Sequence, residues 1–183
     1  MKSNLSLTLF KIVLTIPVAY ALLYPFLNPE VGGGVFKELE LLGPIGSAIV
    51  AAVFLGLIVF YCLDLQRSLS LVRPGARVAS PRSVWLMFLL PYNFVEDFFI
   101  IAHVAKSLAQ EAQFNASLRA FKSFGWLSGM GWCAAQIVSL LPNEIGSLAG
   151  LLALALWILH WRLIRRINSA LLAASELASA QPA

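Results

Sequence analysis

The topology of this chain depends on residues 84–108, which read VWLMFLLPYNFVEDFFIIAHVAKSL. The stretch is apolar enough to enter a membrane, yet it contains four polar residues, Asn93, Glu96, Asp97 and His103. Ionisable groups are costly at membrane depth and often mark functional sites there. We therefore take these four residues as the candidate polar or ion-handling site.

The composition places the chain in the membrane class. Of its 183 residues, 60% are hydrophobic and 12% are charged, whereas soluble domains carry about 25% charged residues. Backbone polar groups in lipid must be satisfied within the chain, and the long apolar runs lack the alternation typical of barrel strands. We predict an all-α integral membrane protein that forms a single domain over residues 1–183.

Four apolar runs are predicted as transmembrane helices. The first resembles a signal sequence in its position, but no small-x-small cleavage site and polar mature domain follow it, so we interpret it as a span. Pro17 and Pro25 should bend this helix or end it near Asn28. We expect the tail, residues 162–183, to continue the last helix on the cytoplasmic side. The predicted spans are residues 7–27, 45–63, 124–142 and 145–161.

The last two spans each carry a pair of glycines at four-residue spacing. Such spacing allows close approach of helix backbones in lipid. Only residues 143–144 join the two spans, so we predict a tight antiparallel hairpin; a homo-oligomer interface is the alternative use of the same surface. The glycines predicted to mediate packing are Gly125, Gly129, Gly146 and Gly150.

The distribution of basic residues decides how many times the chain crosses. If residues 84–105 formed a fifth span, six basic residues would lie on the cytoplasmic side and seven outside. If the stretch re-enters from the cytoplasmic face or lies along it, twelve lie inside and only Lys37 lies outside. Cytoplasmic loops are enriched in Lys and Arg. We predict four spans with both termini in the cytoplasm, in a bacterial inner membrane.

Ten of these cytoplasmic basic residues are predicted to contact anionic headgroups or a protein partner. Each such residue near an anionic surface contributes about 1 kcal/mol. Insertion bias alone is the simpler explanation of their position, and lipid or partner recognition is secondary to it; a nucleic-acid role is not predicted for a polytopic membrane protein. The residues are Arg67, Arg73, Arg77, Arg82, Lys106, Arg119, Lys122, Arg162, Arg165 and Arg166.

The second half of the opening stretch has the pattern of an interfacial amphipathic helix. It is preceded by a short apolar limb that dips into the membrane and turns at Pro91. Limb and helix together form the amphipathic segment, residues 84–113. Apolar residues such as Phe94 and Ile101 would face lipid. The side predicted to face water carries Glu96, Asp97, His103, Ser107, Gln110 and Glu111.

Residues 90–108, LPYNFVEDFFIIAHVAKSL, also carry a resemblance. The Pro-x-Asn segment and the Ala-Lys-x-Leu ending are similar to a segment between the second and third spans of small uncharacterised bacterial four-span membrane proteins. Those proteins tend to carry Tyr-Trp after the Asn, where this chain departs with Val95 and Glu96. The resemblance implies the four-span topology with a re-entrant segment, and it implies no activity.

The remaining residues that could react or bind a cofactor suggest few alternative functions. Cys62 and Cys133 lie in apolar runs and are interpreted as packing residues. His103 and His160 would be the ligands of a bis-histidine haem, a minor alternative. Protease, hydrolase and P-loop motifs are missing from the sequence. We predict no catalytic residue, cofactor or metal.

The functional hypothesis is a non-enzymatic accessory or scaffold subunit that meets lipid or a protein partner through its basic cytoplasmic face. The alternative is a small oligomeric transporter or channel in which Glu96 and His103, seven residues apart and on one helix face, handle ions or protons. The polar face is expected to pair with Arg82, Lys106 or the tail arginines. A Glu96 that is neutralised by an arginine and covered by lipid would favour the first hypothesis, whereas a water-filled cavity that reaches Glu96 from the cytoplasm would favour transport.

Overall fold

The computed structural model describes residues 5–28 and 41–180, and in these ranges the regular structure is entirely helical. Lys2 and Lys37, which entered the charge count, lie outside them. The α-helices are α1 (Leu5–Leu27), α3 (Gly43–Leu71), α4 (Asn93–Ala112), α5 (Trp126–Val138) and α6 (Glu144–Ala180). Three 3-10 helices connect them, η1 (Pro74–Ala76), η2 (Pro81–Phe88) and η3 (Ala116–Leu118).

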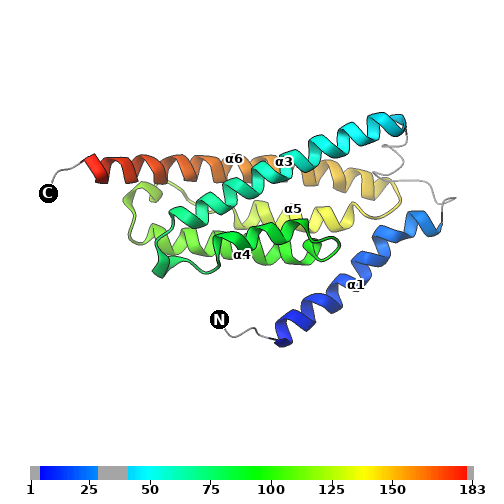
Figure 1. Cartoon of the computed structure of the whole chain (residues 1–183), viewed down its shortest axis with the longest axis horizontal. Helices are drawn as coiled ribbons and strands as arrows, with labels where there is room; N and C mark the ends of the chain where they lie inside the picture. The colour runs from blue at the N-terminus through cyan, green and yellow to red at the C-terminus, as the bar shows by residue number, and fades with distance from the viewer. Residues whose placement is uncertain (1–4, 29–40, 181–183) are drawn as a thin grey trace.

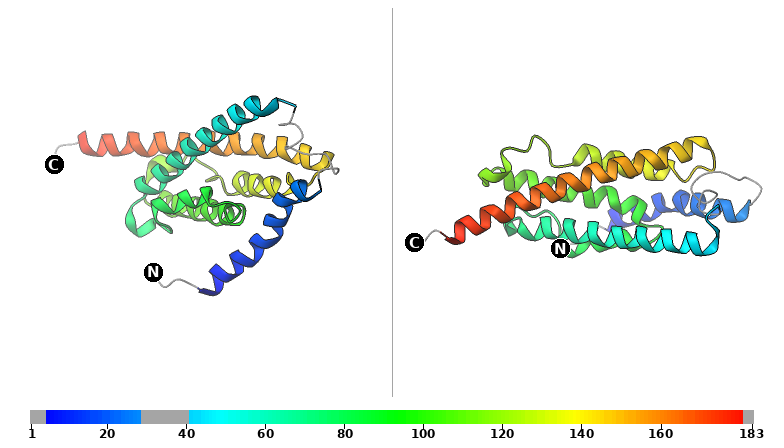
Figure 2. Two further views of the ribbon diagram at one scale, coloured as in Figure 1. Left: turned by 45° about the vertical axis from the view of Figure 1, so that its right-hand side comes forward. Right: turned by 90° about the horizontal axis from the view of Figure 1, so that it is seen from above.

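The helices α3, α4, α5 and α6 form one bundle, and α1 diverges from it (Figure 1). Within the bundle α5 packs on α6 and α4, and α3 packs on α6 and η2. The views in Figure 2 show α6 running the length of the bundle, with its C-terminal part extending beyond the other helices. The hydrophobic core therefore lies between α3, α4, α5 and α6.

Three helices, α1, α3 and α6, are long and apolar enough to cross a membrane. The run predicted as the third span forms a shorter helix, because α5 has 13 residues. At 1.5 Å per residue it is about 20 Å long, less than the hydrocarbon thickness of about 30 Å. A turn over residues 139–143 then leads into α6.

Helix α3 is longer than its predicted span, residues 45–63. Pro44 occupies its first turn, where the missing backbone N–H costs nothing. The helix continues to Leu71 and buries Leu65 and Leu69 beyond the apolar run. Its C-cap residue is Val72, whose backbone is extended and which lies two residues before Pro74. The tail likewise continues α6 to Ala180, as predicted.

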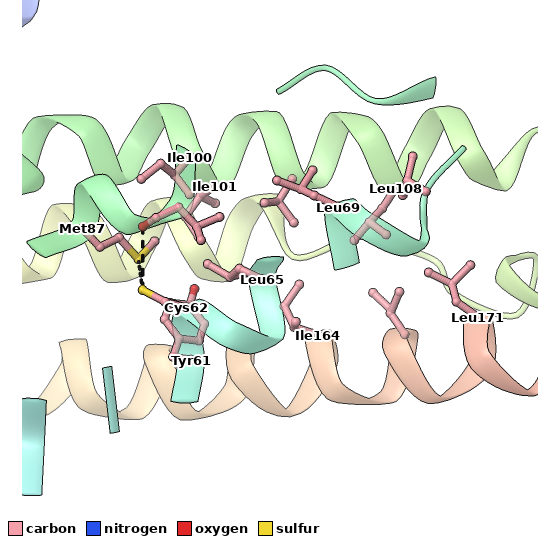
Figure 3. Packing of buried hydrophobic residues seen from close by; sticks show 14 of the residues in the cluster. Tyr61, Cys62, Leu65, Leu69, Met87, Ile100, Ile101, Leu108, Ile164 and Leu171 are labelled. Carbon is pink, nitrogen blue, oxygen red and sulfur yellow. Dashed lines mark hydrogen bonds between the residues drawn. The ribbon is translucent and has the colours of Figure 1, made fainter. Parts of the chain in front are cut away.

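Helix α4 is the most enclosed element of the fold. It packs against α1, α3, α5 and all three 3-10 helices, and only Lys106 and Ala109 along it are fully exposed. Figure 3 shows its side chains Ile101 and Leu108 meeting residues of α3 and α6. The predicted water-facing side is wrong for several of its residues: Glu96, Asp97, Ser107 and Glu111 are all buried.

Helix α1 is the least enclosed. Of its 23 residues only Lys11 and Val18 are buried. The helix contains Pro17 and Pro25 but runs without a break to Leu27. Its contacts with the bundle are made to α4. The position of α1 therefore depends on a few side chains, and Lys11 is the charged one among them.

Candidate functional site

Glu96, one of the two acids of the opening stretch, forms an ion pair with Lys11 of α1. The Lys11 Nζ donates to Glu96 Oε2 at 2.6 Å, and the two side chains are only 9% and 8% exposed. The same ammonium lies 3.9 Å from the centroid of the Phe99 ring. Arg82, Lys106 and the tail arginines were the expected partners of the polar face, but the partner of Glu96 comes from α1 instead.

The neighbouring acid, Asp97, points to the other side of α4. Adjacent residues on a helix diverge by about 100°, so Glu96 faces α1 while Asp97 faces α5. Asp97 is 2% exposed, and Gln136 Nε2 donates to its Oδ2 over a long 3.5 Å. Its Oδ1 has no hydrogen-bond partner among the described residues. Burial raises the pKa of Asp97 well above its usual value.

Asn93 lies one helical turn before Asp97. It is buried, and its Oδ1 also lacks a hydrogen-bond partner in the described ranges. Buried polar atoms are satisfied in the great majority of native structures. Two unsatisfied acceptors one turn apart on the same helix are therefore a feature that needs an explanation.

His103 belongs to the group formed by Lys11 and Glu96. It is partly buried, and both of those side chains act on it electrostatically. Its burial, and next the Lys11 cation, lower the pKa of His103. Glu96 thus acts on His103 only through its charge, and Lys11 already forms an ion pair with that carboxylate.

His160 is enclosed by protein on both ring nitrogens. Its Nδ1 lies 2.8 Å from the Tyr61 hydroxyl. A Cβ placed on Gly125 would come within 2.7 Å of His160 Nε2, and one on Gly129 within 3.1 Å. The ring therefore fills the space that the two glycines leave open, and this arrangement argues against His160 as an axial haem ligand.

The four predicted packing glycines have different surroundings. Gly125 and Gly129 bring α5 against His160 of α6, and Gly125 also begins α5 with a φ of +82° that favours glycine. A Cβ on Gly146 would overlap the Leu141 carbonyl within the hairpin itself. Gly150 is partly buried. Gly146 therefore permits the turn, while Gly125 and Gly129 permit the helix contact.

The two cysteines are buried. The Cys62 thiol lies 3.7 Å from the Val84 carbonyl oxygen and 3.6 Å from Met87 Sδ, both in η2. Cys133 is 1% exposed. These contacts fit the packing role predicted for both residues, and those of Cys62 hold η2 against α3.

A polar network that sequence analysis missed joins α3 to α6. Trp161 Nε1 donates to Asp64 Oδ2 at 2.6 Å, and Asn168 Nδ2 donates to the Asp64 backbone carbonyl at 2.9 Å. Ser68 then donates to Asn168 Oδ1 at 2.7 Å. The only signal in the sequence is polar residues at helical spacing beyond each apolar run, which does not identify partners about 100 residues apart.

Three of the predicted lipid-binding arginines have structural partners. Arg73 donates through its side-chain Nε at 3.0 Å and its backbone N–H at 3.1 Å to Glu111 of α4. Arg77 donates to the carbonyl oxygens of Val72 and Ser70 at the end of α3. A third, Arg165, lies 3.8 Å from Asp64.

The other seven predicted basic residues are exposed, and none forms an ion pair within the described part of the chain. They lie on the second half of α3, on η2, on α4, on the connection around η3 and on the middle of α6. We call these seven residues the basic face: Arg67, Arg82, Lys106, Arg119, Lys122, Arg162 and Arg166.

Across residues 5–28 and 41–180, no group of three or more His, Cys, Asp or Glu side chains is arranged to hold a metal ion. Comparisons with protein-family models, with curated proteins and with solved structures give no match to this chain.

Proposed function

We propose that this chain is a non-enzymatic integral membrane protein that binds anionic lipid headgroups through the basic face and serves as an accessory or scaffold subunit there. The observation that carries the proposal is the opposite orientation of acids and bases. Asp64, Glu96 and Glu111 turn inward to partners on other elements, whereas the seven cations of the basic face turn outward.

The proposed topology has four crossings, with both termini in the cytoplasm of a bacterial cell and the chain in its inner membrane. Gly125 lies close to His160 and Leu163 of α6, and the hairpin at the other end of α5 leads into Glu144. The chain from Gly125 to the hairpin thus runs beside 19 residues of α6, about 28 Å, which supports a crossing.

The segment of residues 84–108 is proposed to re-enter from the cytoplasmic side. Its limb η2 packs on α3 and on α4, and Cys62 of α3 contacts both Val84 and Met87. Non-helical backbone at membrane depth is tolerated where protein covers it. The resemblance to four-span proteins with a Pro-x-Asn segment agrees with this placement.

The ion-handling alternative relied on Glu96 and His103. Because Lys11 neutralises Glu96 at 2.6 Å and both side chains are buried, the geometry supports a structural role for that acid. The basic face, in contrast, consists of exposed charges that have no acidic partner in the described ranges. Seven such charges at about 1 kcal/mol each would favour an anionic surface strongly.

The lipid assignment is tested by native mass spectrometry of the full chain from nanodiscs that contain equal phosphatidylglycerol and phosphatidylcholine. We expect phosphatidylglycerol to be enriched on the wild type and on the charge-conserving variant Arg119→Lys/Arg162→Lys/Arg166→Lys, and to lose its enrichment on Arg119→Gln/Lys122→Gln/Arg162→Gln/Arg166→Gln. Equal enrichment on all three proteins, or a protein partner retained by these residues without lipid preference, would overturn the assignment.

The topology is tested by cysteines introduced at Lys106 and Arg119. Both positions are exposed, and the native Cys62 and Cys133 are buried and give little background. A membrane-impermeant thiol reagent should label the introduced cysteines in inverted vesicles and not in intact cells. Labelling from the outside of intact cells would contradict the four-crossing arrangement.

A further inference from the structure

The unexplained feature of the core is the pair of unsatisfied oxygens at the start of α4. Asn93 is 8% exposed and Asp97 is 2% exposed, and the Oδ1 of each lacks a partner among the described residues. Side chains four residues apart on a helix are neighbours. Both of these oxygens are acceptors, so while Asp97 is ionised neither oxygen can satisfy the other.

The surroundings of Asp97 contain no cation among the described residues. The titratable groups that interact with it are Tyr61 and Cys62 from α3, Cys133 from α5 and Glu96 from α4. All four are neutral or negative at neutral pH, and the negative one is paired with Lys11 of α1. Within residues 5–28 and 41–180, the only hydrogen-bond donor to the Asp97 carboxyl is the neutral amide of Gln136, at 3.5 Å.

An ionised carboxylate buried without a partner is so unfavourable that such groups become neutral instead. A proton on Asp97 would turn its Oδ1 into a donor, and the one other buried side-chain oxygen that lacks a partner among the described residues is the Asn93 Oδ1, one turn earlier. A single proton therefore accounts for both unsatisfied atoms at once. A metal ion fits less well, because Asn93 is the first residue of α4 and helix N-termini disfavour cations.

We propose that Asp97 is a proton-binding site: its carboxyl takes up one proton from water when the chain folds and donates it to Asn93 Oδ1. The site is separate from the basic face and independent of what that face binds. It places the protonatable group of the opening stretch at Asp97, on the α5 side of α4, and leaves Glu96 as the ionised partner of Lys11.

The proton is observed directly by infrared spectroscopy of the full chain in detergent or lipid. The wild type should show the carbonyl stretch of a protonated carboxylic acid at neutral pH. The band should shift when aspartate carboxyls carry ¹³C, and the chain has only two aspartates, Asp64 and Asp97. The band should persist in Asp64→Asn and Glu96→Gln and disappear in Asp97→Asn.

A wild type without this band, or a band that ¹³C-aspartate leaves unshifted, overturns the proposal even if Asp97→Asn fails to fold. So does a band that survives in Asp97→Asn.

A second measurement uses the pH dependence of unfolding. The folded state binds a proton that the unfolded chain releases above its ordinary aspartate pKa, so wild-type stability should fall as pH rises toward the raised pKa of Asp97. Asp97→Asn imitates the protonated acid and should remove this part of the pH dependence, leaving a melting temperature at or above that of the wild type at high pH. A variant that is less stable than the wild type at every pH would show that the ionised form is the native one.

Discussion

Helices α1 and α4 differ in how much of each is buried, and the difference is opposite to what hydrophobicity alone would predict. Helix α1 carries one charged residue among 23, yet only Lys11 and Val18 of it are buried. Helix α4 carries Glu96, Asp97, Lys106 and Glu111 and is buried on nearly every side. In lipid, apolar side chains gain little from leaving the surface, whereas polar ones gain partners by turning inward. Between these two helices, burial therefore follows polar partnership more closely than apolar character.

The contrast depends most on the ion pair that joins the two helices. Lys11→Met leaves Glu96 buried without its cationic partner, and we expect a loss of about 3–5 kcal/mol in the free energy of unfolding. The double variant Lys11→Met/Glu96→Leu should recover most of this loss, and Lys106→Met, at an exposed lysine of α4, should change little. The measurement is denaturation in mixed micelles. Equal stability of Lys11→Met and wild type would show that α1 is held by other contacts.

Truncation of apolar residues should sharpen the difference. Ile101 of α4 is fully buried, so Ile101→Ala should destabilise the fold by about 2–5 kcal/mol through the cavity it leaves. Leu9 of α1 is 52% exposed, and Leu9→Ala should cost less than about 0.5 kcal/mol. Both values come from the same unfolding assay. Similar losses for the two variants would mean that α1 packs as closely as α4.

A smaller effect is expected where α5 approaches α4. Gly129→Ala would overlap Ile101 and crowd the His160 ring, and we expect a loss of about 1–3 kcal/mol. Gly56 of α3 provides the control, because a Cβ there meets no atom within 4 Å. Gly56→Ala should be neutral or stabilising by up to about 1 kcal/mol. A tolerated Gly129→Ala would show that the contact between α4 and α5 can relax.

The smallest effect concerns an exposed ion pair. Arg165 Nε lies 3.8 Å from Asp64 Oδ2, and the arginine side chain is 70% exposed. Solvent screens such pairs, so Arg165→Gln should lower the free energy of unfolding by less than about 1 kcal/mol. High salt should weaken the wild-type contribution to the same degree. A loss as large as that of Lys11→Met would remove the distinction between buried and exposed pairs.

Much of the helical framework was predictable from the sequence. The apolar runs locate α1, α3 and α6, and helix periodicity correctly separates the directions of Glu96 and Asp97. The length of α5 was not predictable, because hydropathy counts apolar residues and does not detect that Gly125 starts the helix late and that a turn follows Val138. The extension of α3 past Leu63 was not predictable for a related reason: the helix continues through polar residues, which hydropathy does not count as part of the run.

The polar contacts were the least predictable part of the candidate site. An amphipathic pattern identifies a polar face but not whether water or protein covers it. Lys11 was counted as a charge on a surface, whereas the structure buries it against a residue 85 positions later. Asn168 and Ser68 carry no local signal at all, since their partners are set by how α6 lies on α3.

The separation of Lys11 and Glu96 in the chain also has a consequence for biosynthesis. At about 5–20 residues per second, the 85 residues between them take about 4–17 s to synthesise. In the proposed topology, helix α1 therefore enters the bilayer with an ammonium group that has no carboxylate partner yet, and water, headgroups or the insertion machinery must accommodate that charge. The ion pair that joins α1 to the bundle can form only after α4 has been synthesised.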